Sequence, residues 1–265
     1  MPFIETDDGI RLHYRTEGSA ANPPLILSNS LGTDLRMWDG QRDLFAERFH
    51  LIRYDVRGHG ASDAPPGAYR LDRLGRDVLN LLDALEIHTV TWCGLSLGGM
   101  LGMWLAINAP HRVTRLALCN TAACMPPKTM WDERIRAVGE RGMGAIASGV
   151  LERWFTAPFR ASGAPEVAAV EAMLLATPPA GYAGCCAAIR DMDQRRALAD
   201  IGHDVLIVAG RDDPATPPDK AEEIRRLVPH AALVVFERCA HLSNIEQRDA
   251  FNRTVLPFLA QSLDG

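Results

Sequence analysis

The sequence predicts an α/β fold: a mostly parallel central sheet flanked by helices, with a helical segment inserted between two of its strands. Two observations support this. Short apolar runs rich in β-branched residues alternate with stretches of helical periodicity, which is typical of parallel strands joined by helices. The alternation stops near residue 121 and resumes near residue 200. We therefore expect a core formed by residues 1–120 and 200–265 and a helical cap domain formed by residues 121–199.

The individual elements follow in order along the chain. Expected strands cover residues 10–14, 24–27, 51–54, 89–93, 113–119, 205–209 and 233–236. Expected helices cover residues 38–49, 71–85 and 100–109, and a last helix passes through Phe251, Val255 and Phe258. Asn244 and Gln247 have the spacing of a capping pair at the start of that last helix. Prolines at 126–127, 165 and 178–179 divide the inserted segment into separate helices.

The most informative motif is Gly94-Leu95-Ser96-Leu97-Gly98, which lies between an apolar strand and a helix. A strand that enters a helix through so tight a turn forces the serine into strained geometry and raises its hydroxyl above the sheet edge. Gly94 and Gly98 flank Ser96 where a Cβ would collide with the neighbouring backbone. The pattern favours a nucleophilic serine over an incidental serine in a glycine-rich turn.

A nucleophilic serine needs an acid and a histidine, and both follow in that order along the chain. Asp212 and Asp213 come directly after the strand at 205–209, and His241 follows the strand at 233–236. His241 would act as general base and an aspartate would orient its imidazole ring. Asp213 is favoured because Pro214 fixes the turn after it, but spacing alone leaves Asp212 open. Taken singly, the aspartate could be a turn former and the histidine a surface residue.

Acyl transfer also needs donors for the oxyanion of the tetrahedral intermediate. One should be the backbone N–H of Leu97, the residue after the nucleophile. The second should come from the loop after an early strand, where the N–H of Leu31 is the candidate. Hydrolases usually carry His-Gly in this loop, whereas this chain has Asn29-Ser30.

These motifs resemble those of α/β-hydrolases, and within that superfamily the chain is similar to 3-oxoadipate enol-lactonases. The likeness spans nearly the whole chain, and the segments that carry it are 27–34, 53–60, 93–99, 131–134, 191–193, 213–218 and 241–246. The elbow and the Arg57-Gly58-His59-Gly60 loop are common to many hydrolases, whereas Ser28-Asn29-Ser30-Leu31-Gly32-Thr33-Asp34 is more particular to the lactonases. The resemblance implies hydrolysis of an enol-lactone in aromatic catabolism, through an acyl-enzyme and with no cofactor or metal.

An enol-lactone of this kind carries a free carboxylate, so its pocket needs a cation and an apolar wall. Trp131 and Arg134 are three residues apart and share one face of a helix. We expect Arg134 to bind the carboxylate and Trp131 to cover the ring, with Trp154 as a further candidate for the wall. The alternative is a solvated arginine beside a core tryptophan. His59 is expected to stabilise its glycine-rich loop and to take no part in the chemistry.

Composition limits the partners. A net charge of −5 argues against nucleic acid, and no apolar run has the length of a membrane span. The six cysteines show no zinc spacing, and the N-terminus lacks an export signal, so we expect a cytoplasmic protein with reduced thiols and a small-molecule substrate. The oligomeric state is not determined by the sequence.

Other functions share the same triad. The sequence allows a general carboxylesterase, a perhydrolase or a C–C bond hydrolase, and also a non-catalytic ligand receptor of the same fold. Dehalogenase and epoxide hydrolase activities are excluded because they need an aspartate in place of Ser96.

Overall fold

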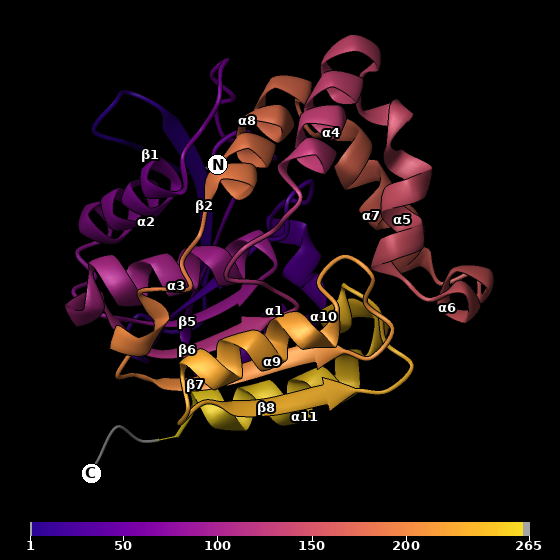
Figure 1. Ribbon diagram of the computed structural model, residues 1–265. Coiled ribbons are helices and arrows are strands. Elements are labelled where there is room, and N and C mark those ends of the chain that lie inside the picture. The colour runs from indigo at the N-terminus through magenta and orange to yellow at the C-terminus, as the bar shows by residue number, and fades with distance from the viewer. Residues whose placement is uncertain (1, 262–265) are drawn as a thin grey trace.

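The computed structural model describes residues 2–261 and contains one eight-stranded sheet, which confirms the predicted α/β fold (Figure 1). Its spatial order is β1-β2-β4-β3-β5-β6-β7-β8. The antiparallel β1 and β2 form one edge, and the other six strands are parallel to one another. The strands are β1 (Phe3–Glu5), β2 (Arg11–Glu17), β3 (Pro24–Ser28), β4 (His50–Tyr54), β5 (Val90–Leu95), β6 (Val113–Cys119), β7 (Asp204–Gly210) and β8 (Ala232–Phe236).

Helices cover both faces of the sheet. On one face lie α1 (Asp39–Ala46) and α11 (Arg248–Leu259), which contact each other and are preceded in the chain by η1 (Leu35–Trp38) and α10 (Ser243–Glu246). On the other face lie α2 (Leu71–Ala84), α3 (Leu97–Asn108) and α9 (Pro218–Leu227), with η2 (Pro110–Arg112) after α3. Parallel strands buried between two helical layers explain why the strands at the centre of the sheet are apolar runs and not alternating ones.

Between β6 and β7 the chain leaves the sheet and forms a group of helices, which Figure 1 shows gathered together away from α9 and α11. These are α4 (Lys128–Arg141), η3 (Met143–Ala145), α5 (Ala147–Trp154), α6 (Ala157–Ala161), α7 (Pro165–Ala176) and α8 (Pro179–Asp191). After α8 the chain returns to the core, where η4 (Leu198–Asp200) contacts α3 and α9. We call residues 121–199 the inserted segment. Within residues 2–261 no single helix is long and apolar enough to cross a membrane, although the bent pair α7 and α8 passes that test together.

Two local predictions were wrong. The helix expected over residues 38–49 is shorter, because a 3₁₀ turn occupies Leu35–Trp38 and the α-helix ends at Ala46. Asn244 caps no helix among the described residues: its side-chain amide donates to the carbonyl of Met37, and α11 begins at Arg248 with no side-chain cap from Gln247. The second error involves a contact with a residue distant in sequence, which local spacing does not reveal.

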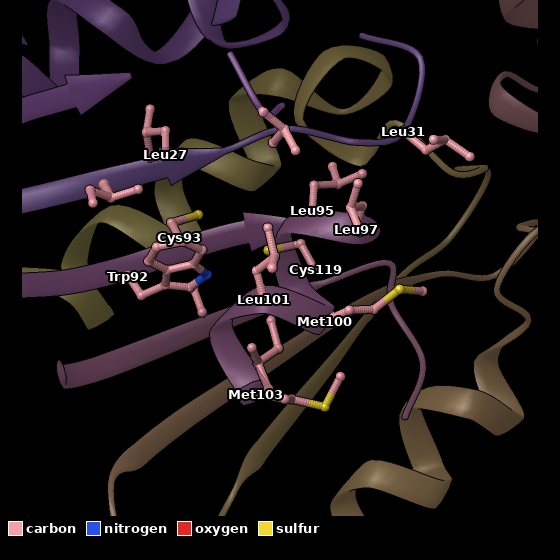
Figure 2. Close-up of a cluster of buried hydrophobic side chains, with 14 of the residues drawn as sticks. Leu27, Leu31, Trp92, Cys93, Leu95, Leu97, Met100, Leu101, Met103 and Cys119 are labelled. Atoms are coloured by element: carbon pink, nitrogen blue, oxygen red, sulfur yellow. The ribbon is translucent and has the colours of Figure 1, made fainter. Parts of the chain in front are cut away.

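Helix α3 is the centre of the core. Its residues from Leu97 to Ala106 are buried all round, so the helix has no polar face. Figure 2 shows side chains of α3 packed with those of β3 and β5, among them Leu27, Trp92 and Leu95. The indole N–H of Trp92 donates to the carbonyl of Gly98 at 3.0 Å. The first turn of α3 is therefore held from several sides.

Candidate active site

The residues predicted for the chemistry all follow the carboxyl ends of parallel strands in the same sheet. Ser96 comes directly after β5, Asp213 lies three residues after β7, and His241 lies five residues after β8. Since parallel strands end at one edge of a sheet, these side chains come from the same rim of the molecule, which is where open α/β sheets bind ligands. Ser96 and His241 line a common cavity there.

The turn at Ser96 has the predicted strain. Its backbone adopts φ 58° and ψ −113°, which is unfavourable for a residue with a side chain. A Cβ on Gly94 would collide with the carbonyl of Gly98, and one on Gly98 would collide with the carbonyl of Ser28. Hydrogen bonds fix the turn: the N–H of Ser96 donates to Cys119, and its carbonyl accepts from the hydroxyl of Thr121 at 2.7 Å. The geometry of the elbow is thus determined by backbone crowding against the end of β3 and by hydrogen bonds to residues at and after the end of β6.

The structure brings Asp213 and not Asp212 to the histidine. The Oδ2 atom of Asp213 lies 2.8 Å from Nδ1 of His241, and both side chains are buried. Asp212 is exposed, and its backbone N–H donates to Cys239. Of the two aspartates that the sequence left open, Asp213 is therefore the one in position to orient the imidazole.

Several donors surround the Asp213 carboxylate. The backbone N–H groups of Ala215 and Thr216 donate to Oδ1 at 2.8 and 3.0 Å, and Oδ2 accepts from the Thr216 hydroxyl at 2.7 Å and the Asn120 amide at 3.0 Å. Burial raises the pKa of Asp213, but the charge of His241 and these donors outweigh it, so the pKa lies below its usual value of 3.8. The carboxylate is held in its ionised form.

Asn120 was missed by the sequence analysis. It follows β6 with φ 44°, a conformation that asparagine tolerates better than most residues. Its amide also donates to the carbonyl of Ala240 at 3.1 Å, and its Oδ1 accepts from Ser243 at 2.6 Å. Asn120 thereby joins the aspartate loop to the histidine loop. Its place after a strand was the only signal in the sequence.

The two expected oxyanion donors lie at the ends of β3 and β5. Among the described residues no hydrogen-bond acceptor engages the N–H of Leu31 or that of Leu97, so both donors are free for a ligand. Asn29 links the two segments: its carbonyl accepts from the N–H of Gly98 at 3.0 Å, and its side-chain amide donates to Tyr54. Although this chain has Asn29-Ser30 where hydrolases usually have His-Gly, the loop is still held against the elbow.

His59 holds the same loop from the other side. The N–H of Gly32 donates to Nε2 of His59 at 2.8 Å, and the opposite ring nitrogen lies 3.3 Å from the carbonyl of Arg57. This network assigns the proton to Nδ1 and keeps the ring neutral. Burial lowers the pKa of His59 below its usual value of 6.5. His59 thus steadies its own loop, as the sequence suggested, and also the loop that carries Leu31.

The cavity is closed on its other side by the inserted segment. All three predicted binding residues line it: Trp131 and Arg134 from α4 and Trp154 from α5. The guanidinium of Arg134 lies 4.9 Å from the centre of the Trp131 ring, in cation–π contact. The remaining wall is mostly apolar and includes Met100, Met125, Met130, Val150 and Ile189.

Four polar residues of the lining were not predicted. They are Ser30, Arg153 from α5, Tyr182 from α8 and Thr216, which also donates to Asp213. The hydroxyl of Ser30 is buried and has no hydrogen-bond partner among the described residues. The sequence does not show which faces of α5 and α8 are turned toward the cavity, so the spacing of residues did not identify Arg153 or Tyr182 as part of its lining.

The inserted segment is tied to the histidine loop. The N–H of Leu242 donates to the carbonyl of Trp154 at 3.1 Å. Glu246 accepts from the N–H of Ala240 at 2.8 Å with one oxygen and from Thr156 with the other. These hydrogen bonds therefore fix the position of α5, which forms part of the cavity wall, relative to the loop that carries His241.

Comparisons with known proteins agree with this architecture. The family model described as alpha/beta hydrolase fold matches residues 23–141 and 163–247. The chain is 43% identical to 3-oxoadipate enol-lactonase 2 of Acinetobacter baylyi over 94% of this chain and 93% of that protein. The crystal structure of the enol-lactonase from Burkholderia xenovorans LB400 superimposes with a TM-score of 0.95 at 39% identity, covering 98% of this chain and 100% of that one. A hydrolase from Pseudomonas aeruginosa PA01 has a TM-score of 0.95 at 47% identity, covering 98% of both chains.

The fold, the strained serine turn and the family match define the chain as an α/β-hydrolase. Within this superfamily it belongs to the 3-oxoadipate enol-lactonase family, as the sequence resemblance indicated, and it is an enzyme of the carboxylic ester hydrolase class.

Proposed function

We propose that the enzyme opens 3-oxoadipate enol-lactone to 3-oxoadipate, with Ser96 as the nucleophile, His241 as the general base and Asp213 as the residue that orients it. One observation carries this proposal: a single cavity contains the strained serine and the histidine on its core side and a guanidinium stacked on an indole on its other side. That arrangement suits a small ring with a carboxylate arm. The names of its relatives point to the same substrate.

In the first half of the reaction, Ser96 Oγ attacks the lactone carbonyl carbon while His241 takes the hydroxyl proton. The N–H groups of Leu31 and Leu97 stabilise the oxyanion, because both are free and need no reorganisation. The ring C–O bond then breaks and expels an enolate, which is a better leaving group than an alkoxide. The enolate takes the proton from His241 and becomes the ketone, and the acyl group stays on Ser96.

In the second half, water attacks the acyl-enzyme carbonyl while His241 takes one of its protons. The tetrahedral intermediate collapses, the ester bond to Ser96 breaks, and the proton returns to Oγ. The product leaves with a new carboxylate at the catalytic end. Asp213 remains ionised throughout and stabilises the imidazolium, in keeping with its lowered pKa. No step uses a metal or a cofactor.

The inserted segment serves in this proposal as a cap domain that selects the substrate. Arg134 binds the carboxylate arm, while Trp131 and Trp154 cover the ring. The role in aromatic catabolism belongs to the same proposal and is supported by the names of the relatives. A cytoplasmic location is in keeping with the six free cysteines.

The test is the loss of ultraviolet absorbance of freshly generated 3-oxoadipate enol-lactone, with the wild type beside Ser96→Ala. Rapid decay that disappears in the variant is the expected result. Cleavage of p-nitrophenyl acetate that depends on Ser96, without lactone decay, would retain the serine hydrolase and discard the substrate. Inertness toward both compounds would favour the non-catalytic receptor that the sequence left open.

A further inference from the structure

Arg153 brings a second guanidinium to the cavity. It projects from α5, whereas Arg134 projects from α4, and both side chains are partly buried. Two other arginines of the inserted segment pair with carboxylates: Arg190 with Asp132 and Asp191 at 2.7 Å, and Arg195 with Asp193. Among residues 2–261, neither Arg134 nor Arg153 lies within 4.0 Å of a carboxylate, and the cavity lining contains no aspartate or glutamate. Two positive charges therefore face one small cavity whose described lining contains no carboxylate, and Glu152, outside that lining, only partly offsets the effects of burial and of Arg134 on Arg153.

Arg134, Arg153 and the buried Tyr182 all line the same cavity. Burial lowers the pKa of Arg153, and the positive charge of Arg134 lowers it further. Both arginines also affect the buried Tyr182. Burial raises the pKa of its phenol, and the positive charges of Arg134 and Arg153 oppose that rise. The charges of the two arginines therefore act on each other and on the phenol across this cavity. Like charges that are partly removed from water repel each other, so this arrangement costs stability unless an anion occupies the site.

We propose that Arg134 and Arg153 form one carboxylate-binding site, and that Arg153 is a specificity-determining residue for substrates with a carboxylate remote from the scissile ester. This rests on the proposed function insofar as Ser96 performs the cleavage. A carboxylate has two oxygens, so one oxygen can accept hydrogen bonds from the guanidinium of Arg134 and the other from that of Arg153. Arg134 is fixed by its stacking on Trp131, whereas Arg153 has no ion-pair or hydrogen-bond partner within the described part of the chain, so a bound carboxylate would order it. The otherwise apolar wall suits the methylene groups between that carboxylate and the ester.

Two chromogenic esters of similar length separate this site from the chemistry. Mono-p-nitrophenyl glutarate carries a terminal carboxylate, and p-nitrophenyl pentanoate does not. For Arg153→Met, which removes the charge but keeps most of the volume, kcat/KM on the glutarate ester should fall about tenfold to a hundredfold, mainly through KM. Activity on the pentanoate ester should change far less. Arg153→Lys should restore part of the preference for the glutarate ester.

Arg136→Met is the matched control, because Arg136 lies on the exposed face of α4 and does not line the cavity. It should leave both esters unaffected. Equal losses on the two esters in Arg153→Met, or no loss on either, would overturn the role of Arg153. If the wild type prefers the glutarate ester but does not open the enol-lactone, the lactonase proposal fails while the carboxylate site stands.

Two further measurements distinguish recognition from a structural role. Adipate should inhibit pentanoate hydrolysis competitively, and Arg153→Met should raise its inhibition constant about tenfold or more. The Tm of Arg153→Met should equal or exceed that of the wild type, since the substitution removes repulsion from Arg134. An unchanged inhibition constant together with a lowered Tm would make Arg153 a structural residue and contradict the proposal.

Discussion

The sheet edge and the inserted segment meet at one cavity, but they determine it in different ways. At the sheet edge, backbone crowding decides the geometry: Gly94 and Gly98 admit no side chain, and Ser96 is forced to a positive φ. In the inserted segment, long side chains from separate helices decide it, as Arg134 and Arg153 do from α4 and α5. The difference suggests a division of labour in which the sheet edge performs a generic acyl transfer and the inserted segment selects the acyl group.

The largest effect should come from the sheet edge. Ser96→Ala and His241→Ala should each lower kcat by about 10⁶, and the double variant should lose little more, because the two residues act as one unit. The loss should be the same for the lactone and for a neutral ester. Rates measured on both substrates check this. Additive losses would contradict the single unit.

A smaller loss is expected for the residue behind the histidine. Asp213→Asn should lower kcat by about 10⁴, because an amide at this position favours the wrong imidazole tautomer. The matched control is Asp212→Asn, since Asp212 is exposed and makes no contact with His241. That control should retain activity near the wild-type level. A similar loss in both variants would mean that the loop and not the contact at 2.8 Å is responsible.

The inserted segment should respond differently. Arg134→Ala should raise KM for the enol-lactone about tenfold to a hundredfold, because a charge-assisted hydrogen bond to the carboxylate is lost. Hydrolysis of a neutral aryl ester should change far less. Steady-state kinetics on both substrates are the measurement. Equal losses would remove Arg134 from carboxylate recognition.

The smallest effect concerns stability and His59. The folded protein keeps this ring neutral, and its pKa is lowered by burial, so the unfolded chain binds more protons below pH 6.5. The contribution of the neutral His59 ring to the free energy of unfolding is therefore complete above pH 6.5, and it is lost as the pH falls below that value. The Tm of the wild type should fall between pH 7.5 and 5.5 by roughly a few degrees more than that of His59→Asn. Parallel decreases in the two proteins would show that His59 is not the group responsible.

The two regions also differ in how far the sequence predicts them. The elbow, the order of the triad and the position of each residue after a strand follow from local patterns, because tight turns leave glycine signatures. The placement of Arg134 and Trp131 on one helix face also followed from their spacing, and the structure adds that the two side chains stack. These features depend on neighbours in the chain.

Long-range contacts could not be predicted. Asn120 reaches Asp213 and Ala240, which are 93 and 120 residues further along the chain. Arg153 and Arg134 line one cavity although they lie on different helices, α5 and α4, which pack mainly against α7 and α8. The capping role expected for Asn244 failed because its side chain bonds to Met37, 207 residues away. Contacts of this kind depend on tertiary packing, which a single sequence does not specify locally.

The division of labour is tested most directly by one ratio: kcat/KM for the enol-lactone divided by kcat/KM for p-nitrophenyl acetate, measured in the wild type, Asp213→Asn and Arg134→Ala. We predict that Asp213→Asn lowers both constants and leaves the ratio near its wild-type value, whereas Arg134→Ala lowers the ratio about tenfold or more. A ratio that changes in Asp213→Asn, or that is preserved in Arg134→Ala, would contradict the separation of chemistry from substrate choice.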